Sequence, residues 1–309
     1  MIATGGARCD RPVVLGPLGV AAALAAALCW TLASGLWRSW PSALNGGRLN
    51  LLKTLIALAT LLPLMLLLPW RLPLASLVLL AGSGAVGIAA GDTLFFAALR
   101  RLGTRRTLTV EAGAPALTTL LAALWLGEHP SGPQLLGIAL ISVAVLLVVR
   151  QQPLANAAST TPARQAWLGS TLALGAVCCG AMGALLARAA WRMTDLHPLQ
   201  AATVRLLAAA VVLLPLLRGW PRPSVVLRWR HWLVPVAATQ LGTVLGIVLQ
   251  QVALGWLGGG PAVALMATAP LMALPLAVLE GDRAGWSGLV SACLGLLGVS
   301  LVAGWPWAL

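Results

Sequence analysis

The stretch GDTLFFAALRRLG at residues 91–103 returns as GIVLQQVALGWLG at residues 246–258, and Gly, Leu, Ala, Leu, Leu and Gly recur 155 residues apart. The same offset carries Pro115 onto Pro270. It also relates two glycine pairs, Gly87 with Gly91 and Gly242 with Gly246. A repeat that covers about half of a 309-residue chain indicates two copies of one structural unit.

The composition places both copies in a membrane. Hydrophobic residues make up 60% of the chain and charged residues 9%, and the mean hydropathy is +0.93, which leaves too little polar surface for a soluble fold. In a soluble protein a net charge of +13 would favour a nucleic-acid partner. Here the basic residues lie in short gaps between apolar runs, where they orient a membrane protein. We therefore expect membrane lipid as a partner and no nucleic acid.

Ten apolar stretches are long enough to cross a bilayer core, which takes about 20 helical residues. They are residues 17–37, 47–68, 76–99, 107–127, 133–149, 167–187, 198–217, 231–256, 260–279 and 285–304. Only a helix satisfies its own backbone hydrogen bonds in lipid, so the sequence predicts an all-α membrane protein with ten transmembrane helices.

The repeat sets the predicted domain organisation. Residues 17–150 and residues 167–304 each hold five spans, between an N-terminal stub at 1–16 and a linker at 151–166. Five is odd, so the two units enter the membrane in opposite senses and form an inverted repeat. Such architectures place a binding site near the bilayer midplane between the two units.

The motifs at the ends of the spans resemble a known family. The first half reads "AALRRLGT", then Pro115, then "LGE" ending at Glu128, then "GIALISVAVLLVV"; the second reads "VALGWLGGG", Pro270 and "GLVSACLGLLGVSLV". From about residue 17 to 304 the chain resembles the EamA type of the drug/metabolite transporter superfamily. The second acidic turn departs from the pattern, since it reads "LEGD" with Glu280 and Asp282. The resemblance implies a central cavity lined mostly by spans 1 to 4 and 6 to 9, with spans 5 and 10 packed behind.

Three ionisable residues in the first half lie at similar depth inside their spans. Lys53, Asp92 and Glu111 are each roughly 6 to 10 Å from the same interface at 1.5 Å per helical residue. A charge at the bilayer centre costs about 2.5 kcal/mol or more, so each needs a partner. We expect an ion pair of Lys53 with one carboxylate, while the other tends to hold a proton. Asn50 shares the helix face of Lys53 and is expected to join this network.

The second half differs at the matching positions. Arg205, the repeat-mate of Lys53, is predicted on the opposite side of the bilayer. Gln250 and Gln251 replace Phe95 and Phe96, while Ile247 and Met266 replace Asp92 and Glu111. Arg205 is therefore expected to find the glutamines, backbone carbonyls, Asp195 or an anionic substrate group. The alternative for both Lys53 and Arg205 is that they snorkel to the interface.

The remaining candidates carry weaker signals. Trp30 and Gln240 either line the cavity or pack between helices. The glycine pairs predict close helix packing within the fold, and Pro115 and Pro270 predict kinks within helices. Glu128 is interpreted as an interface residue at a turn. The cysteines are scattered through apolar runs, so we expect neither a metal nor a cofactor.

The basic residues outside the spans predict an orientation. Thirteen arginines fall on the side opposite the N-terminus and five on the N-terminal side, which places both termini outside the cytoplasm. No Walker motif is present in the sequence, so ATP is not the expected driver.

Together these features predict a transporter and not an enzyme. We expect an inner-membrane secondary transporter that exports a small metabolite, an amino acid or a related compound, by alternating access. Proton coupling through Asp92 or Glu111 is a further hypothesis. A lipid-acting membrane enzyme and a non-transporting accessory protein stay as alternatives. The expected state is a monomer, with an oligomer left open.

Overall fold

The computed structural model describes residues 16–40, 44–69, 72–151, 163–218, 230–272 and 286–303, and these residues form helices and no strand. The first half contains α1 (Pro17–Ser39), α2 (Gly46–Leu66), α3 (Leu74–Ser83), the π-helical segment η1 (Gly84–Asp92), α4 (Thr93–Glu111), α5 (Ala114–Leu121), the π-helical η2 (Ala122–Leu126) and α6 (Gly132–Gln151). The second half contains α7 (Ala163–Met193), α8 (Pro198–Leu213), the 3-10 segment η3 (Leu214–Leu217), α9 (Arg230–Thr239), the π-helical η4 (Gln240–Leu245), α10 (Gly246–Trp256), α11 (Gly259–Met266) and α13 (Trp286–Ala303).

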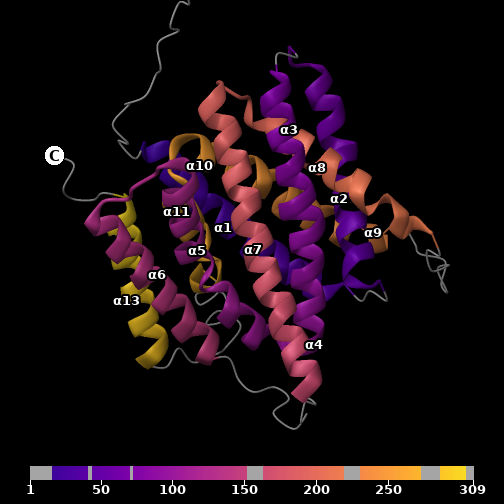
Figure 1. Ribbon diagram of the computed structural model, residues 1–309. Coiled ribbons are helices and arrows are strands. Elements are labelled where there is room, and N and C mark those ends of the chain that lie inside the picture. Colours follow the sequence, from indigo (N-terminus) through magenta and orange to yellow (C-terminus); the bar gives the residue numbers. More distant parts are fainter. Residues whose placement is uncertain are drawn as a thin grey trace, which may run out of the picture.

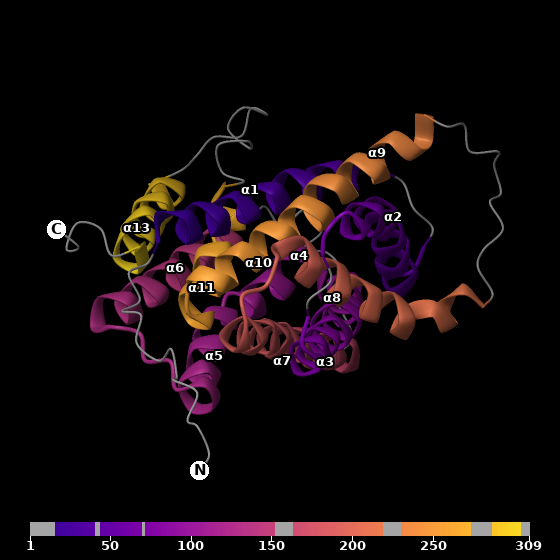
Figure 2. The same ribbon diagram turned by 90° about the horizontal axis from the view of Figure 1, so that it is seen from above.

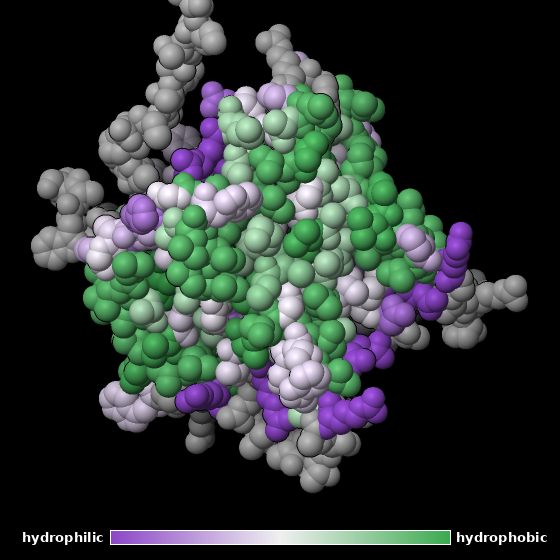
Figure 3. All heavy atoms as spheres, in the orientation of Figure 1, coloured by the Kyte–Doolittle hydropathy of each residue, from purple (hydrophilic) through white to green (hydrophobic). Residues whose placement is uncertain are grey.

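Within the described residues, seven helical stretches are long and apolar enough to cross a membrane. They are Pro17–Trp37, Gly46–Leu66, Leu74–Leu102, Arg106–Leu126, Ala166–Met193, Pro198–Leu217 and Trp232–Trp256. Three shorter apolar helices, Gly132–Leu147, Gly259–Met272 and Gly288–Ala303, accompany them. Hydrophobic side chains cover most of the face seen in Figure 3, and hydrophilic ones gather toward its edges. This surface suits a protein surrounded by lipid.

The two halves interlock instead of forming separate domains (Figures 1 and 2). The helix α2 packs on α8, α5 on α11, and α6 on α13, so several elements contact their counterparts in the other half. The remaining contacts are exchanged: α7 packs along α3, η1 and α4, while α1 packs along α9, η4 and α10. Figure 2 shows α1 running beside α9 and α10, with α13 and α6 at one end.

Glycines allow the exchanged contacts to be close. A Cβ added at Gly183 of α7 would lie 2.6 Å from the Cα of Gly87 in η1, and the Ser83 hydroxyl donates to the Gly183 carbonyl at 2.6 Å. In the other half, a Cβ at Gly242 would lie 2.6 Å from the Cβ of Ala33 in α1. Both glycine pairs therefore serve packing within the fold, because small residues let two helix backbones approach.

The helices are interrupted at matching points of the two halves. Two-residue turns occur at 112–113 and at 267–268, which are 155 positions apart. Pro115 lies in the first turn of α5, and Pro270 follows the second interruption by two residues. Each apolar stretch is therefore interrupted shortly before its proline, and neither proline lies in mid-helix as predicted. Each proline stands near the start of a helical segment, where its missing N–H has no hydrogen bond to lose.

Two π-helical segments, η1 and η4, follow the repeat as well. Moved by 155 positions, η1 at 84–92 covers 239–247, which contains η4 at 240–245. The wider π turn is often found at functional sites, and both segments here adjoin the glycines that contact α7 and α1.

The connection expected at residues 100–106 is helical. The helix α4 continues from Thr93 to Glu111 through these residues, so the prediction of a loop there is wrong. Arginine and leucine favour helices and the segment contains no proline, so the local sequence does not end the helix before the turn at residue 112.

Candidate functional site

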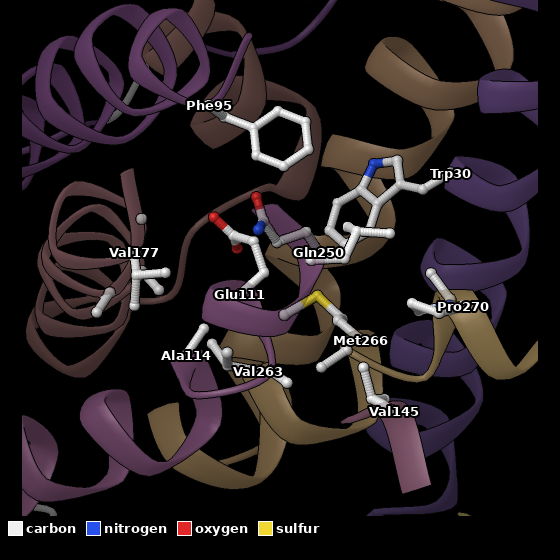
Figure 4. Close-up of a pocket in the computed structure, with 17 residues that line it drawn as sticks. Trp30, Phe95, Glu111, Ala114, Val145, Val177, Gln250, Val263, Met266 and Pro270 are labelled. Atoms are coloured by element: carbon white, nitrogen blue, oxygen red, sulfur yellow. The ribbon is translucent and has the colours of Figure 1, made fainter. Parts of the chain in front are cut away.

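A cavity of about 330 Å³ lies between the two halves (Figure 4). The helices α1, α4, α5, α6, α7, α10 and α11 contribute to its wall. The lining residues are Trp30, Phe95, Leu108, Glu111, Ala112, Ala114, Val145, Val177, Gly180, Ala181, Ala184, Gln250, Val263, Met266, Ala267, Ala269 and Pro270. The expectation for span 5 needs a correction, because Val145 of α6 reaches the cavity. No lining residue comes from α2 or α8, so spans 2 and 7 contribute less than expected.

Repeat-mates meet in this cavity. Ten of its 17 lining residues form five pairs separated by 155 positions. The pairs are Phe95 with Gln250, Leu108 with Val263, Glu111 with Met266, Ala112 with Ala267, and Ala114 with Ala269. The wall is thus nearly symmetric in position. Its chemistry is asymmetric, because each half supplies one polar side chain where the other half supplies an apolar one.

The polar side chains of the cavity are few. Figure 4 shows the Glu111 carboxyl and the Gln250 amide pointing into the space between Phe95, Trp30 and Met266. The Trp30 indole N–H is already bonded, since it donates to the Gly242 carbonyl at 2.9 Å. Trp30 therefore lines the cavity and also joins α1 to η4.

Lys53 and Asp92 lie beside the cavity as an ion pair. The Lys53 Nζ donates to the Asp92 Oδ2 at 2.5 Å, and the side chains are 13% and 36% exposed. The ammonium also lies 5.5 Å from the centroid of the Phe96 ring, within range of a cation–π interaction. Asp92 is therefore the carboxylate that Lys53 compensates.

Asn50 belongs to the same region without contacting the ion pair directly. Its amide donates to the Ile88 carbonyl at 2.8 Å and to the Thr93 hydroxyl at 3.2 Å. Asn50 is fully buried, and its Oδ1 has no partner among the described residues. These bonds hold α2 against η1 at the start of α4, next to Asp92.

Arg205 is buried rather than snorkelled. It is 3% exposed, and its Nη1 donates to the Gln250 Oε1 at 2.7 Å. Asp92 also lies close enough for electrostatic attraction. Asp92 therefore interacts with both cations, and the placement of Lys53 and Arg205 on opposite sides of the bilayer stays a prediction. Arg205 supports the cavity from behind Gln250 and is not a lining residue.

Glu111 is left with its carboxylate facing the cavity. The negative charge of Asp92 repels the Glu111 carboxylate. No hydrogen-bond or ion-pair partner of Glu111 is found in the described part of the chain. The side chain is half-buried among apolar residues of α4, α7 and α11. An unpartnered carboxylate in such surroundings needs water, a proton or a ligand.

The other two glutamine candidates lie away from the cavity. The Gln240 amide donates to the Thr60 hydroxyl at 2.7 Å, which joins η4 to α2. Gln251 is fully buried, and its Oε1 accepts from the Trp191 indole N–H at 3.1 Å. Both side chains link helices, so among the three glutamines only Gln250 lines the cavity.

Sequence reasoning missed a second ion pair. Arg188 of α7 donates from Nε to the Glu128 Oε1 at 2.7 Å, and both side chains are 15% exposed. The other Glu128 oxygen accepts from the Gly259 N–H at 2.6 Å, and Arg188 Nη1 donates to the Leu254 carbonyl at 2.9 Å. Glu128 therefore joins the two halves from the turn between η2 and α6, two residues past the end of the apolar stretch Arg106–Leu126. Its place at the membrane interface stays a prediction. The signal available in the sequence was the placement of both charges at span ends on the same predicted side.

Comparisons with known proteins agree with this architecture. The sequence model described as the EamA-like transporter family matches residues 17–150 and 167–304. No curated protein matches the chain. A solved structure named "Crystal structure of protein" is similar with a TM-score of 0.72 and 19% identity, over 92% of this chain and 95% of that one. At this identity the likeness concerns the fold.

Proposed function

This chain belongs to the EamA-like transporter family, and on that premise we propose that it is a secondary transporter of a small metabolite, an amino acid or a related compound. The observation that carries the proposal is the cavity, which is built from repeat-mates of both halves and contains one unpartnered carboxylate. A cavity between two repeats is where alternating access exposes a substrate to either side.

Alternating access rests on a further proposal about the repeat. We propose that the three shorter apolar helices of the described residues also cross the membrane beside the seven long ones. The chain would then have ten spans, five in the unit at 17–150 and five in the unit at 167–304. An odd number of spans per unit inverts the second unit relative to the first. The pairing of α2 with α8, α5 with α11 and α6 with α13 supports this arrangement, because a two-fold axis brings such counterparts together.

A transport assay tests the proposal. The full chain is reconstituted in proteoliposomes and loaded with labelled metabolites, chosen by a screen for export from cells with and without the protein. We expect saturable efflux without ATP that depends on the protein. Efflux equal to that from empty liposomes for every metabolite exported in cells would leave the accessory-protein alternative.

Proton coupling through Glu111 is part of the proposal. Lys53 neutralises Asp92, so Glu111 is the carboxylate that is free to exchange a proton with the cavity. We expect Glu111→Gln to abolish substrate flux driven by a pH gradient while it leaves counterflow without a gradient measurable. Asp92→Asn is expected to reduce both fluxes, because it leaves the Lys53 ammonium without its ion-pair partner. Gradient-driven flux that survives in Glu111→Gln would contradict coupling at this residue.

No feature of the described cavity favours the alternative of a lipid-acting enzyme. The described residues hold no group of three His, Cys, Asp or Glu side chains able to bind a metal. We place the transporter in the inner membrane, with export as its direction and both termini outside the cytoplasm.

A further inference from the structure

We propose that the cavity binds a compact organic ammonium ion, an amine with an apolar body, in preference to an anion or an amino-acid zwitterion. The inference rests on the proposed function and, among amino acids and related compounds, favours the amines that lack a carboxylate. Four properties of the cavity carry it: its charge, its aromatic wall, the state of Gln250 and its size.

The first property is charge. Glu111 is the single ionisable side chain among the 17 lining residues, and it lacks a partner within the described structure. Lys53 is engaged by Asp92, and Arg205 stands behind Gln250. An anion in the cavity would therefore meet a carboxylate with no cation on the wall. An ammonium group would form a charge-assisted hydrogen bond that satisfies the carboxylate.

The aromatic wall favours the same ligand. The rings of Trp30 and Phe95 lie on opposite sides of the opening above Glu111 in Figure 4. A cation within about 6 Å of an aromatic ring is attracted by the negative face of the ring, most strongly for tryptophan. The same faces also bury the apolar body of an amine.

Gln250 offers the ligand a second, weaker polar contact. Its Oε1 is taken by Arg205, so the amide nitrogen is the polar atom that remains for a ligand. That nitrogen is neutral and donates, so it suits a hydroxyl, an ether or a ring face better than it compensates a full negative charge. An amino acid would bring its carboxylate near Glu111 with only this amide to receive it.

The size limits the ligand. About 330 Å³ lies at the small end of the range of roughly 300 to 1,000 Å³ for ligand pockets. The wall is otherwise made of Ala, Val, Leu, Gly, Met and Pro residues, which add apolar contact without polar specificity. The fitting ligand is a small amine that carries one ring or a branched chain.

A series of four probes with one phenylethyl body tests the inference on the purified full chain in detergent. The probes are 2-phenylethylammonium, 2-phenylethanol, 3-phenylpropionate and phenylalanine, and the readouts are thermal stabilisation and the Kd from titration calorimetry. We expect the ammonium to bind about ten-fold or more tightly than each of the other three, as a charged hydrogen bond is worth. Equal or tighter binding of 3-phenylpropionate or phenylalanine, or no binding of the ammonium, overturns the inference.

Variants separate the carboxylate from the shape of the cavity. Glu111→Gln is expected to remove the preference for the ammonium while 2-phenylethanol still binds. Arg101→Gln changes one charge on the exposed part of α4 and is expected to leave the preference intact. If Glu111→Gln does not fold, the probe series on the unaltered chain still decides the question.

The repeat offers a rescue experiment. Met266 occupies the position of Glu111 on the other half and lines the same cavity. In the double variant Glu111→Met with Met266→Glu the carboxylate moves to the opposite wall, and we expect the ammonium preference to return. A double variant that folds and binds 2-phenylethanol without preferring the ammonium would contradict the role of the carboxylate.

Flux measurements keep this inference apart from the proposed function. If the ammonium binds and is not moved across proteoliposome membranes, transport of that ligand fails and the ligand class stands. If an anion or zwitterion is transported while the ammonium does not bind, the ligand class fails and the transporter stands.

Discussion

At the scale of single residues, chemistry at the site comes from differences between repeat-mates. Glu111 faces the cavity where the other half has Met266, and Gln250 does so where the first half has Phe95. The repeat therefore explains where these side chains lie, and the sequence differences explain what they do. The sequence identified Glu111 and Gln250 as candidates, since both interrupt apolar spans. It did not separate Gln250 from Gln251, because adjacent helical residues differ by about 100° in direction, which alone does not say which side chain meets the cavity.

Gln250→Leu tests the support of Arg205. The change removes the acceptor of a buried guanidinium, so we expect a loss of about 1.5 to 3 kcal/mol in the free energy of unfolding, as for a hydrogen bond to a charged group. Gln240→Leu is the matched control, because it removes a bond between two neutral groups, worth about 0.5 to 1.5 kcal/mol. Denaturant unfolding in detergent compares the two. Equal losses would mean that Arg205 gains little from Gln250.

At the scale of helices, glycines decide which elements touch. A close approach joins α7 to η1 at Gly183 and Gly87, and α7 runs along the cavity through Val177, Gly180 and Ala184. The sequence predicted close packing from the glycine spacing. It did not identify the partner helix, because a GxxxG pair states that a neighbour comes near and not which one.

Gly183→Ala and Gly180→Ala make a matched pair on α7. A Cβ at Gly183 would lie 2.6 Å from the Gly87 Cα, whereas a Cβ at Gly180 meets nothing within 4 Å. We expect Gly180→Ala to stabilise the protein by about 0.5 to 1 kcal/mol, since alanine favours a helix over glycine. Gly183→Ala is expected to destabilise it, because the backbone of η1 must move. Melting temperatures in detergent provide the comparison, and a rise in both variants would contradict the close contact.

The ion pair between Glu128 and Arg188 ties the end of η2 to α7 and to the ends of α10 and α11. Arg188→Met would leave a largely buried carboxylate without its cation, and breaking such a pair costs about 3 to 5 kcal/mol. Arg192→Met is the control on the same helix, since Arg192 is exposed and, among the described residues, donates to the Leu126 carbonyl without an ion pair. We expect a much lower melting temperature for Arg188→Met than for Arg192→Met. Similar melting temperatures would show that the pair contributes little.

At the scale of the whole molecule, the distribution of arginines predicts orientation. Thirteen on one side against five on the other would keep the arginine-rich side in the cytoplasm and both termini outside. A C-terminal fusion to alkaline phosphatase is therefore expected to be active, and a fusion to a fluorescent protein that folds only in the cytoplasm is expected to be dark. The reverse result would place the termini inside and would contradict the orientation predicted from the arginines.

The membrane environment of this protein, its helical class and its internal repeat can all be read from the amino-acid sequence. These follow from composition, from the length of apolar runs and from a constant offset, all of which are properties of the chain in one dimension. Three contacts follow from the packing of the helices and could not be read from the sequence. Asp92 forms an ion pair with Lys53 and attracts Arg205, Gln250 and not Gln251 reaches the cavity, and Glu128 pairs with Arg188. Those contacts join residues from 39 to 113 positions apart across interlocked halves. They depend on how whole helices cross and rotate relative to one another. Glycine contacts and helix interruptions determine this geometry, and the hydropathy of a span contains no information about it.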